Sequence, residues 1–194
     1  MRRLLNFFAC GCLLLSAAAA SAQERPPRHY EDRGACPFEC CTYRDWTVNA
    51  DTVFYSSRSE RSGVAFRARK GERVEGLTGV VITSEPGRAV ASGDMKVGGN
   101  GGREVRVGKG AVVYLLHYEG EGSYKIWYRG RLYHDRPVRD EEHAGRPPEA
   151  ARRPSLSLLR EPDAVWWVKV RNGRGRVGWS RQTRHFDNMD ACGG

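Results

Sequence analysis

The chain has 194 residues, of which 32 are Lys or Arg and 23 are Asp or Glu, so its formal net charge is +9 at pH 7. That length allows one medium domain or two small ones. A hydrophobic content of 40% is enough to build a core, which excludes a wholly disordered chain. No apolar run follows residue 22, which excludes a protein that crosses a membrane several times. The five His lack the spacing of metal ligands, so no metal centre and no cofactor is expected.

Residues 1–22 have the three parts of a secretory signal peptide. Two arginines precede an apolar stretch from Leu4 to Leu15, and Ala20-Ser21-Ala22 then resembles a cleavage site. The alternative is an uncleaved anchor, because the apolar and small-residue segment is almost long enough to span a bilayer. We favour cleavage, which predicts a periplasmic or secreted protein without a membrane span.

The charge of the mature chain is also informative. Cleavage removes two of the 32 basic residues and none of the 23 acidic ones, which leaves a formal charge of +7. Such an excess of positive charge favours binding to anionic polymers or lipid phosphates, or it serves only to keep the protein soluble. Because export separates the protein from nucleic acid, no nucleic-acid partner is expected.

Four of the six cysteines follow the signal peptide, at Cys36, Cys40, Cys41 and Cys192. In an oxidising compartment an even number predicts two disulfides, with three possible connectivities. Three of the four cluster near the mature N-terminus, so at least one bridge should tie that cluster to Cys192. The residues do not decide whether Cys40 or Cys41 makes it. The spacing C-x-x-x-C-C differs from the C-x-x-C of thiol oxidoreductases, which favours a structural role.

In chain order, residues 23–45 form a polar segment that carries the cysteine cluster. From Trp46 to Val90 the sequence is a series of short apolar runs separated by turn residues, which is typical of β-strands. Two longer runs follow, at Val105–Tyr118 and Tyr124–Tyr133. No segment has a long helical period, so the sequence predicts an all-β fold of short strands, which favours small barrels.

Residues 134–163 contain five prolines among mixed charges. This composition predicts a long exposed insertion, with one helical turn at Ser155–Arg160. A strand resumes at Ala164–Arg171, and Asn172-Gly173 is a hairpin signal.

Four segments carry a resemblance to a known family. Residues 69–77 (RKGERVEGL) are similar to a "kGe-x-V" strand, and Trp166–Trp179 is similar to a closing "W-x-x-V … G-x-x-G-W" hairpin. A second, partial copy lies in Val107–Leu116 and Tyr124–Gly130. These motifs resemble bacterial SH3-like (SH3b) domains, and the matches span about residues 52–182.

The resemblance implies an SH3-like β domain at 46–182, interrupted by the 134–163 insertion and followed by a tail at 183–194. One elaborated barrel and two nested or tandem barrels both fit. It also implies a non-catalytic binding module that contacts cell-wall material or peptides. The ligand residues of the family vary too much to be carried over by position.

Alternation in two predicted strands places a tryptophan among cations on the face away from the core. These candidate ligand-binding residues are Trp127 with Lys125 and Arg129, and Trp167 with Lys169 and Arg171. One interpretation is an aromatic, basic groove that stacks a sugar or peptide and holds an anionic group. The other is that each Trp packs beneath the insertion or between two barrels.

Catalytic motifs are weak in this chain. Gly173–Gly178 matches G-x-G-x-x-G, but no helix follows it, so the motif indicates a hairpin rather than a dinucleotide site. His117 lies in a strand, where an ordinary hydrogen-bonded His is expected, and His134 is expected to be solvated.

The sequence therefore predicts a non-catalytic periplasmic or secreted module that contacts cell-wall peptides or glycans, or another envelope protein. The alternative is a secreted enzyme, either a thiol redox protein or a cysteine hydrolase, that uses Cys40 or Cys41. An inhibitor or structural factor of the envelope is a third interpretation.

Overall fold

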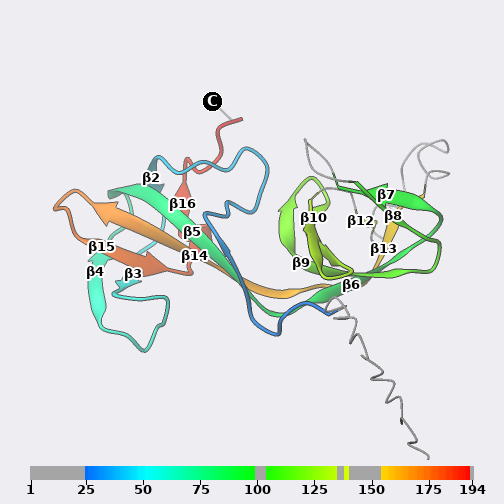
Figure 1. Ribbon diagram of the computed structural model, residues 1–194. Coiled ribbons are helices and arrows are strands. Elements are labelled where there is room, and N and C mark those ends of the chain that lie inside the picture. Colours follow the sequence, from blue (N-terminus) through cyan, green and yellow to red (C-terminus); the bar gives the residue numbers. More distant parts are fainter. Residues whose placement is uncertain (1–24, 99–103, 135–137, 140–153, 193–194) are drawn as a thin grey trace, which may run out of the picture.

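The structure of the chain is a computed structural model that describes residues 25–98, 104–134, 138–139 and 154–192 (Figure 1). The expected signal peptide at 1–22 lies outside the described residues. Within them the regular elements are strands and one short 3-10 helix, η2 (Thr183–His185), so the predicted all-β fold is confirmed. Among the described residues no helix has the length and apolar character needed to cross a membrane.

The strands form two large sheets and one small hairpin. The first sheet has the order β16-β2-β5-β14-β15-β3-β4, with β1 also paired to β5. Its strands are β1 (Tyr30–Arg33), β2 (Asp45–Val48), β3 (Thr52–Tyr55), β4 (Val64–Ala68), β5 (Arg73–Glu85), β14 (Asp163–Asn172), β15 (Val177–Ser180) and β16 (Phe186–Asp187).

The second sheet has the order β11-β10-β9-β6-β13-β12. Its strands are β6 (Gly87–Ala91), β9 (Val112–Gly120), β10 (Ser123–Tyr128), β11 (Arg131–Tyr133), β12 (Val138–Arg139) and β13 (Leu156–Arg160). Strands β7 (Met95–Val97) and β8 (Val105–Val107) pair only with each other.

One long antiparallel ladder joins the two sheets. Strand β5 has 13 residues and β14 has 10, and they pair from Glu85 and Asp163 at one end to Val74 and Asn172 at the other. The chain leaves the first sheet at the end of β5, builds the second sheet, and returns as β14. We call residues 25–85 and 163–192 the first lobe and residues 87–160 the second lobe, and Figure 1 shows β5 and β14 running from the first lobe toward the second. The second lobe is thus inserted between two paired strands of the first.

Each lobe has its own hydrophobic core. The core of the first lobe consists of Trp46, Val48, Phe54, Phe66, Ala68, Val74, Val168, Val170, Phe186 and Met189. The core of the second consists of Ala89, Ala91, Val97, Val107, Val113, Leu115, Tyr124, Ile126, Tyr128 and Leu156. The two sets share no residue, so each small sheet buries its own apolar face.

The helical turn expected at Ser155–Arg160 is wrong. Leu156–Arg160 is strand β13, which pairs antiparallel with β6 and parallel with β12. Leu156 is fully buried, and Leu158 packs against the same core. Ser and Leu alternate here with a period of two, which suits a strand with one buried face and not a helix. This end of the 134–163 segment therefore belongs to the second sheet, while residues 140–153 lie outside the described residues.

The placement of β13 gives a stability prediction. Leu156→Ala should lower the free energy of unfolding by about 2–5 kcal/mol, because it leaves a cavity in the second core. Leu159→Ala is the matched control, since Leu159 is on the same strand but 56% exposed, and should stay within about 0.5 kcal/mol of wild type. Urea unfolding of both variants measures the difference. Equal, small effects would show that the segment is a surface insertion after all.

Candidate functional site

The candidate residues of the second lobe do not share one open face. The expected core set of Tyr124, Ile126 and Tyr128 is buried, as alternation predicted. Lys125, on the opposite face, is only 8% exposed, because its ammonium group contacts Asp32 on β1 of the first lobe. The basic face expected around Lys125 is therefore covered by β1.

The other two residues of that set are separated from Lys125. Trp127 is half-buried and lies in the ladder between Tyr114 and Leu132. Arg129 is exposed in the turn after β10, where its φ is 48° and its guanidinium lies 5.1 Å from the centre of the Tyr128 ring. A positive φ takes the chain out of the strand, so the alternation that placed Arg129 beside Trp127 ends before it.

Trp167 is buried as well, with 6% of its surface exposed. It lies opposite Val80, itself 5% exposed, in the middle part of the ladder that passes between the lobes. The expected outward position is wrong for this residue, and its burial fits the packing interpretation. Further along β14, Arg171 pairs with Glu75 at 2.9 Å, whereas Lys169 extends toward a different aromatic residue, Trp179.

Trp179 is the center of an aromatic and basic surface on the first lobe. In the sheet it lies between Lys169 on β14 and Tyr55 on β3. The Lys169 ammonium is 5.6 Å, and the Arg58 guanidinium 5.7 Å, from the centre of the Trp179 ring. The side chains of Tyr55 and Trp179 are both half-buried. We call Tyr55, Arg58, Lys169 and Trp179 the Trp179 face.

Such a surface has a definite binding chemistry. A partly exposed indole offers a flat apolar face, and cations beside it can hold an anionic group of the same ligand. Alternation along Ala164–Arg171 predicted an outward position for Lys169, but beside Trp167. In the sequence Trp179 stands out only as part of the closing hairpin, although alternation from Val177 also predicts an outward position for it.

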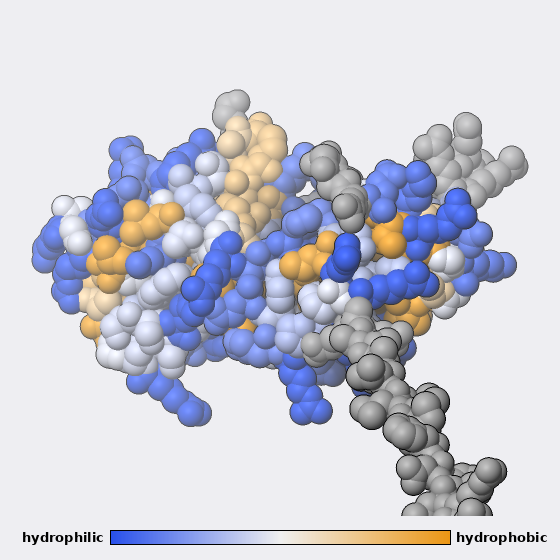
Figure 2. Space-filling view, in the orientation of Figure 1, coloured by the Kyte–Doolittle hydropathy of each residue, from blue (hydrophilic) through white to orange (hydrophobic). Residues whose placement is uncertain are grey.

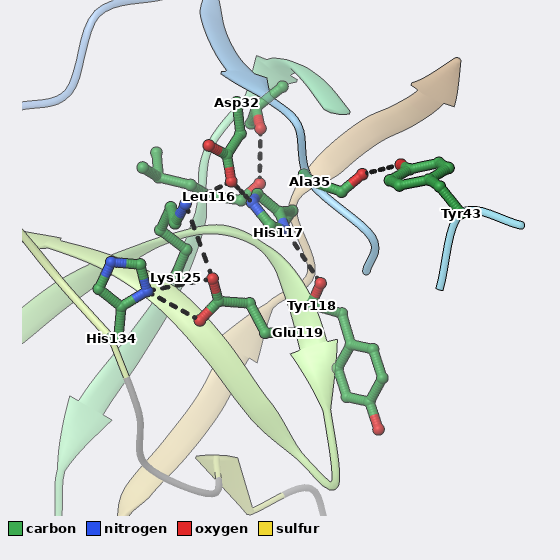
Figure 3. A network of polar contacts seen from close by, with 10 residues as sticks. Asp32, Ala35, Tyr43, Leu116, His117, Tyr118, Glu119, Lys125 and His134 are labelled. Atoms are coloured by element: carbon green, nitrogen blue, oxygen red, sulfur yellow. Dashed lines mark hydrogen bonds and ion pairs between the residues drawn. The ribbon is translucent and has the colours of Figure 1, made fainter. Parts of the chain in front are cut away.

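A second group of polar residues lies where β1 meets the second lobe (Figure 3). Asp32 comes from β1, His117 and Glu119 from β9, and Lys125 from β10. His117 Nε2 is 2.7 Å from Asp32 Oδ2, and Lys125 Nζ contacts the same oxygen and lies 3.7 Å from Glu119 Oε1. His134, mostly exposed as expected, approaches Glu119 at 3.2 Å. We call Asp32, His117, Glu119 and Lys125 the junction cluster.

The polar groups of the junction cluster are engaged by one another and by the backbone. His117 Nδ1 is 2.8 Å from the Tyr118 carbonyl oxygen and Nε2 faces the Asp32 carboxylate. The His117 ring and the Lys125 ammonium group together face the carboxylates of Asp32 and Glu119. Burial raises the pKa of Asp32, but hydrogen bonds from His117 and Lys125 outweigh it and hold that pKa below its usual value.

Three ligand atoms of the junction cluster, from Asp32, His117 and Glu119, lie within 4.8 Å of one another, as a metal site would require. The ammonium group of Lys125 already contacts both carboxylates, however, and both His117 nitrogens are engaged. The cluster supplies its own cation. It connects β1 of the first lobe to β9 and β10 of the second, which makes it an ionic clasp between the lobes.

All four described cysteines are paired, as Cys36–Cys41 and Cys40–Cys192. The expectation that Cys192 joins the N-terminal cluster is confirmed, and its partner is Cys40. That bridge spans 152 residues of sequence. In the chain-entropy model a loop of this length stabilises the fold by roughly 4–5 kcal/mol. Pairs of this kind are compatible with a chain that folds outside the cytoplasm.

Comparisons of the chain with family models, with curated proteins and with solved structures give no match.

The lowered pKa of Asp32 sets the direction of a pH dependence. The carboxylate favours the folded state above its unfolded pKa, near 3.8, and this contribution is lost as pH falls through the lower pKa of the folded state. In the Asp32→Asn variant, this loss of folding stability at low pH should be absent. At pH 7 the substitution should also lower the free energy of unfolding by roughly 3–5 kcal/mol, because the buried Lys125 ammonium group loses a charged partner.

Urea unfolding from pH 7 to pH 2 tests this. The control is Asp45→Asn, which changes an exposed carboxylate on β2 and should leave the curve within about 0.5 kcal/mol of wild type. If the free energy of unfolding of Asp32→Asn fell at low pH as much as that of wild type, the result would contradict the ionic clasp.

The burial of Trp167 gives a separate prediction. Trp167→Ala should lower the free energy of unfolding by roughly 3–5 kcal/mol, the usual loss for a large buried aromatic side chain. Val177→Ala, at a position 37% exposed on the neighbouring strand, should have little effect. Denaturant titration compares the two, and a loss below about 1 kcal/mol at Trp167 would indicate an accessible groove residue.

Proposed function

We propose that this chain is a non-catalytic binding module of the periplasm or the extracellular space. It resembles SH3-like domains, and its ligands are cell-wall peptides or glycans, or another protein of the envelope. The Trp179 face is the proposed contact surface. The observation that carries the proposal is an indole ring flanked by two cations on an outward sheet face.

The two cations of the Trp179 face differ in their availability. Arg58 pairs with Glu31 at 3.0 Å, which fixes its guanidinium beside the ring. Among the described carboxylates none pairs with Lys169, whose ammonium is left to meet a negative group of the ligand. Peptides with free carboxylates and sugars with apolar ring faces match that combination of stacking and charge.

The face of the molecule seen in Figure 2 is mostly hydrophilic, and its hydrophobic residues lie in small separate patches. On that face there is no broad apolar area of the kind that large protein–protein interfaces use. This favours a ligand that engages a few side chains, such as a wall fragment.

The enzyme alternative required a thiolate at Cys40 or Cys41. Both are in disulfide bonds in the structure, so neither is available as the nucleophile of a cysteine hydrolase. Against a thiol redox protein, which also forms a disulfide when oxidised, stands the C-x-x-x-C-C spacing. A count of free thiols in the non-reduced mature protein tests the hydrolase. Zero free thiols is the expected result, and one reactive thiol would favour the hydrolase.

The binding test uses the mature chain and purified cell-wall sacculi in a sedimentation assay, with envelope extract as a second bait. Trp179→Ala should lower the affinity about tenfold, because a stacking contact contributes on the order of 1 kcal/mol or more. Lys169→Met should also weaken binding while keeping the aliphatic stem. Lys109→Met, a change of the same charge at an exposed position of the second lobe, is the control.

Melting temperatures of the three variants separate lost binding from lost folding. Unchanged binding by both Trp179→Ala and Lys169→Met, with the folds intact, would overturn the Trp179 face as the contact surface. Failure of the wild-type chain to bind either bait would overturn the proposed function itself.

A further inference from the structure

A separate pocket of about 650 Å³ lies at the end of the ladder where the chain passes into the second lobe. Arg25 and Arg28 line it from the segment before β1, and Arg88, Tyr114 and Arg160 line it from three strands of the second sheet. It shares no lining residue with the Trp179 face or the junction cluster. We call it the arginine pocket.

Register places two arginines of the pocket side by side. Arg88 on β6 lies directly opposite Arg160 on β13 and directly opposite Tyr114 on β9. The three side chains therefore form a row across neighbouring strands. Like charges opposite each other destabilise a sheet, so this row needs negative charge nearby to offset the repulsion.

The protein supplies only part of that charge. Arg160 pairs with Glu85 at 2.7 Å and also donates to the Pro86 carbonyl oxygen. Asp163, the other carboxylate of the pocket, accepts a hydrogen bond from Ser84 at 2.6 Å.

Three guanidinium groups of the pocket remain without a carboxylate. Among the described residues Arg25, Arg28 and Arg88 have no ion-pair partner, so four guanidinium groups face two carboxylates. The described residues that line the pocket therefore carry a net charge of +2.

From this charge and geometry we infer that the arginine pocket binds a ligand with two or more oxyanion groups, either phosphates or carboxylates. A guanidinium group donates two parallel hydrogen bonds to such an oxyanion. The volume is that of a pocket for a small organic molecule rather than for a single ion. The half-buried ring of Tyr114, beside Arg88, provides the apolar wall.

Isothermal titration calorimetry of the mature chain tests this with three probes: tripolyphosphate, citrate and inorganic phosphate. Tripolyphosphate or citrate should bind once per chain and at least tenfold more tightly than inorganic phosphate. The affinity should fall as salt is added, because charge dominates the contact. Binding by only one of the two multivalent probes would assign the ligand to phosphates or to carboxylates, and either result supports the pocket.

Variants locate the site. Arg88→Gln should weaken binding of the multivalent probe at least tenfold, and Arg88→Lys, which keeps the charge without the fork, should weaken it less. The matched control is Arg67→Gln, the same change at an exposed position of the first lobe, which should alter affinity less than twofold. Equal losses in Arg88→Gln and Arg67→Gln would reduce the effect to net charge and overturn the inference, as would the absence of binding by both multivalent probes.

The arginine pocket and the Trp179 face are tested separately. Trp179→Ala should bind tripolyphosphate or citrate as wild type does, because Trp179 is not in the pocket. Loss of probe binding in that variant would contradict two independent sites.

Discussion

The β5–β14 ladder is the constraint on which the remaining structure depends. A second lobe can be inserted between two paired antiparallel strands only if its first and last residues lie next to each other. Gly87, the first residue of β6, meets this condition, because a Cβ at that position would lie 2.6 Å from the Arg160 carbonyl oxygen and from the Pro162 nitrogen. The outgoing and returning chains touch there at the backbone, which leaves no room for a side chain. The Arg160–Glu85 pair then spans the same crossing point.

With the ladder alone, the two lobes would be connected through the ends of β5 and β14 and nothing would fix their relative orientation. The junction cluster adds a second attachment, because Asp32 belongs to β1, which pairs with β5, while His117 and Lys125 belong to the second sheet. Buried ion groups cost desolvation and often give little net stability. Their geometry is nevertheless specific, since a carboxylate held between the His117 ring and the Lys125 ammonium group has few alternative positions. The junction cluster therefore serves mainly to fix how one lobe is placed against the other.

The parts of the fold that depend on local sequence could be predicted, and the parts that depend on distant pairing could not. Apolar alternation and turn residues were sufficient for the all-β class, and the count of cysteines was sufficient for a bridge to Cys192. The burial of Lys125 was not predictable, because the residue that covers it, Asp32, is far away in sequence; the burial of Trp167 likewise has no local signal, since its ladder partner is Val80. The pairing of Asp32 with His117 joins residues 85 positions apart, and no local pattern marks it. Strand β13 was missed because a short Ser–Leu alternation between prolines is a weak signal.

The two disulfides bear on the Trp179 face through the chain that follows it. After β15 the chain runs through η2 and β16, where Phe186 and Asp187 pair with β2, and then reaches Cys192, which is bonded to Cys40. Strand β15 is thus held on one side by its hairpin with β14 and beyond its other end by a covalent bond. A binding surface that is already fixed loses less conformational entropy when a ligand binds. The Trp179 face is consequently best ordered in an oxidising compartment, where the bridge to Cys192 persists.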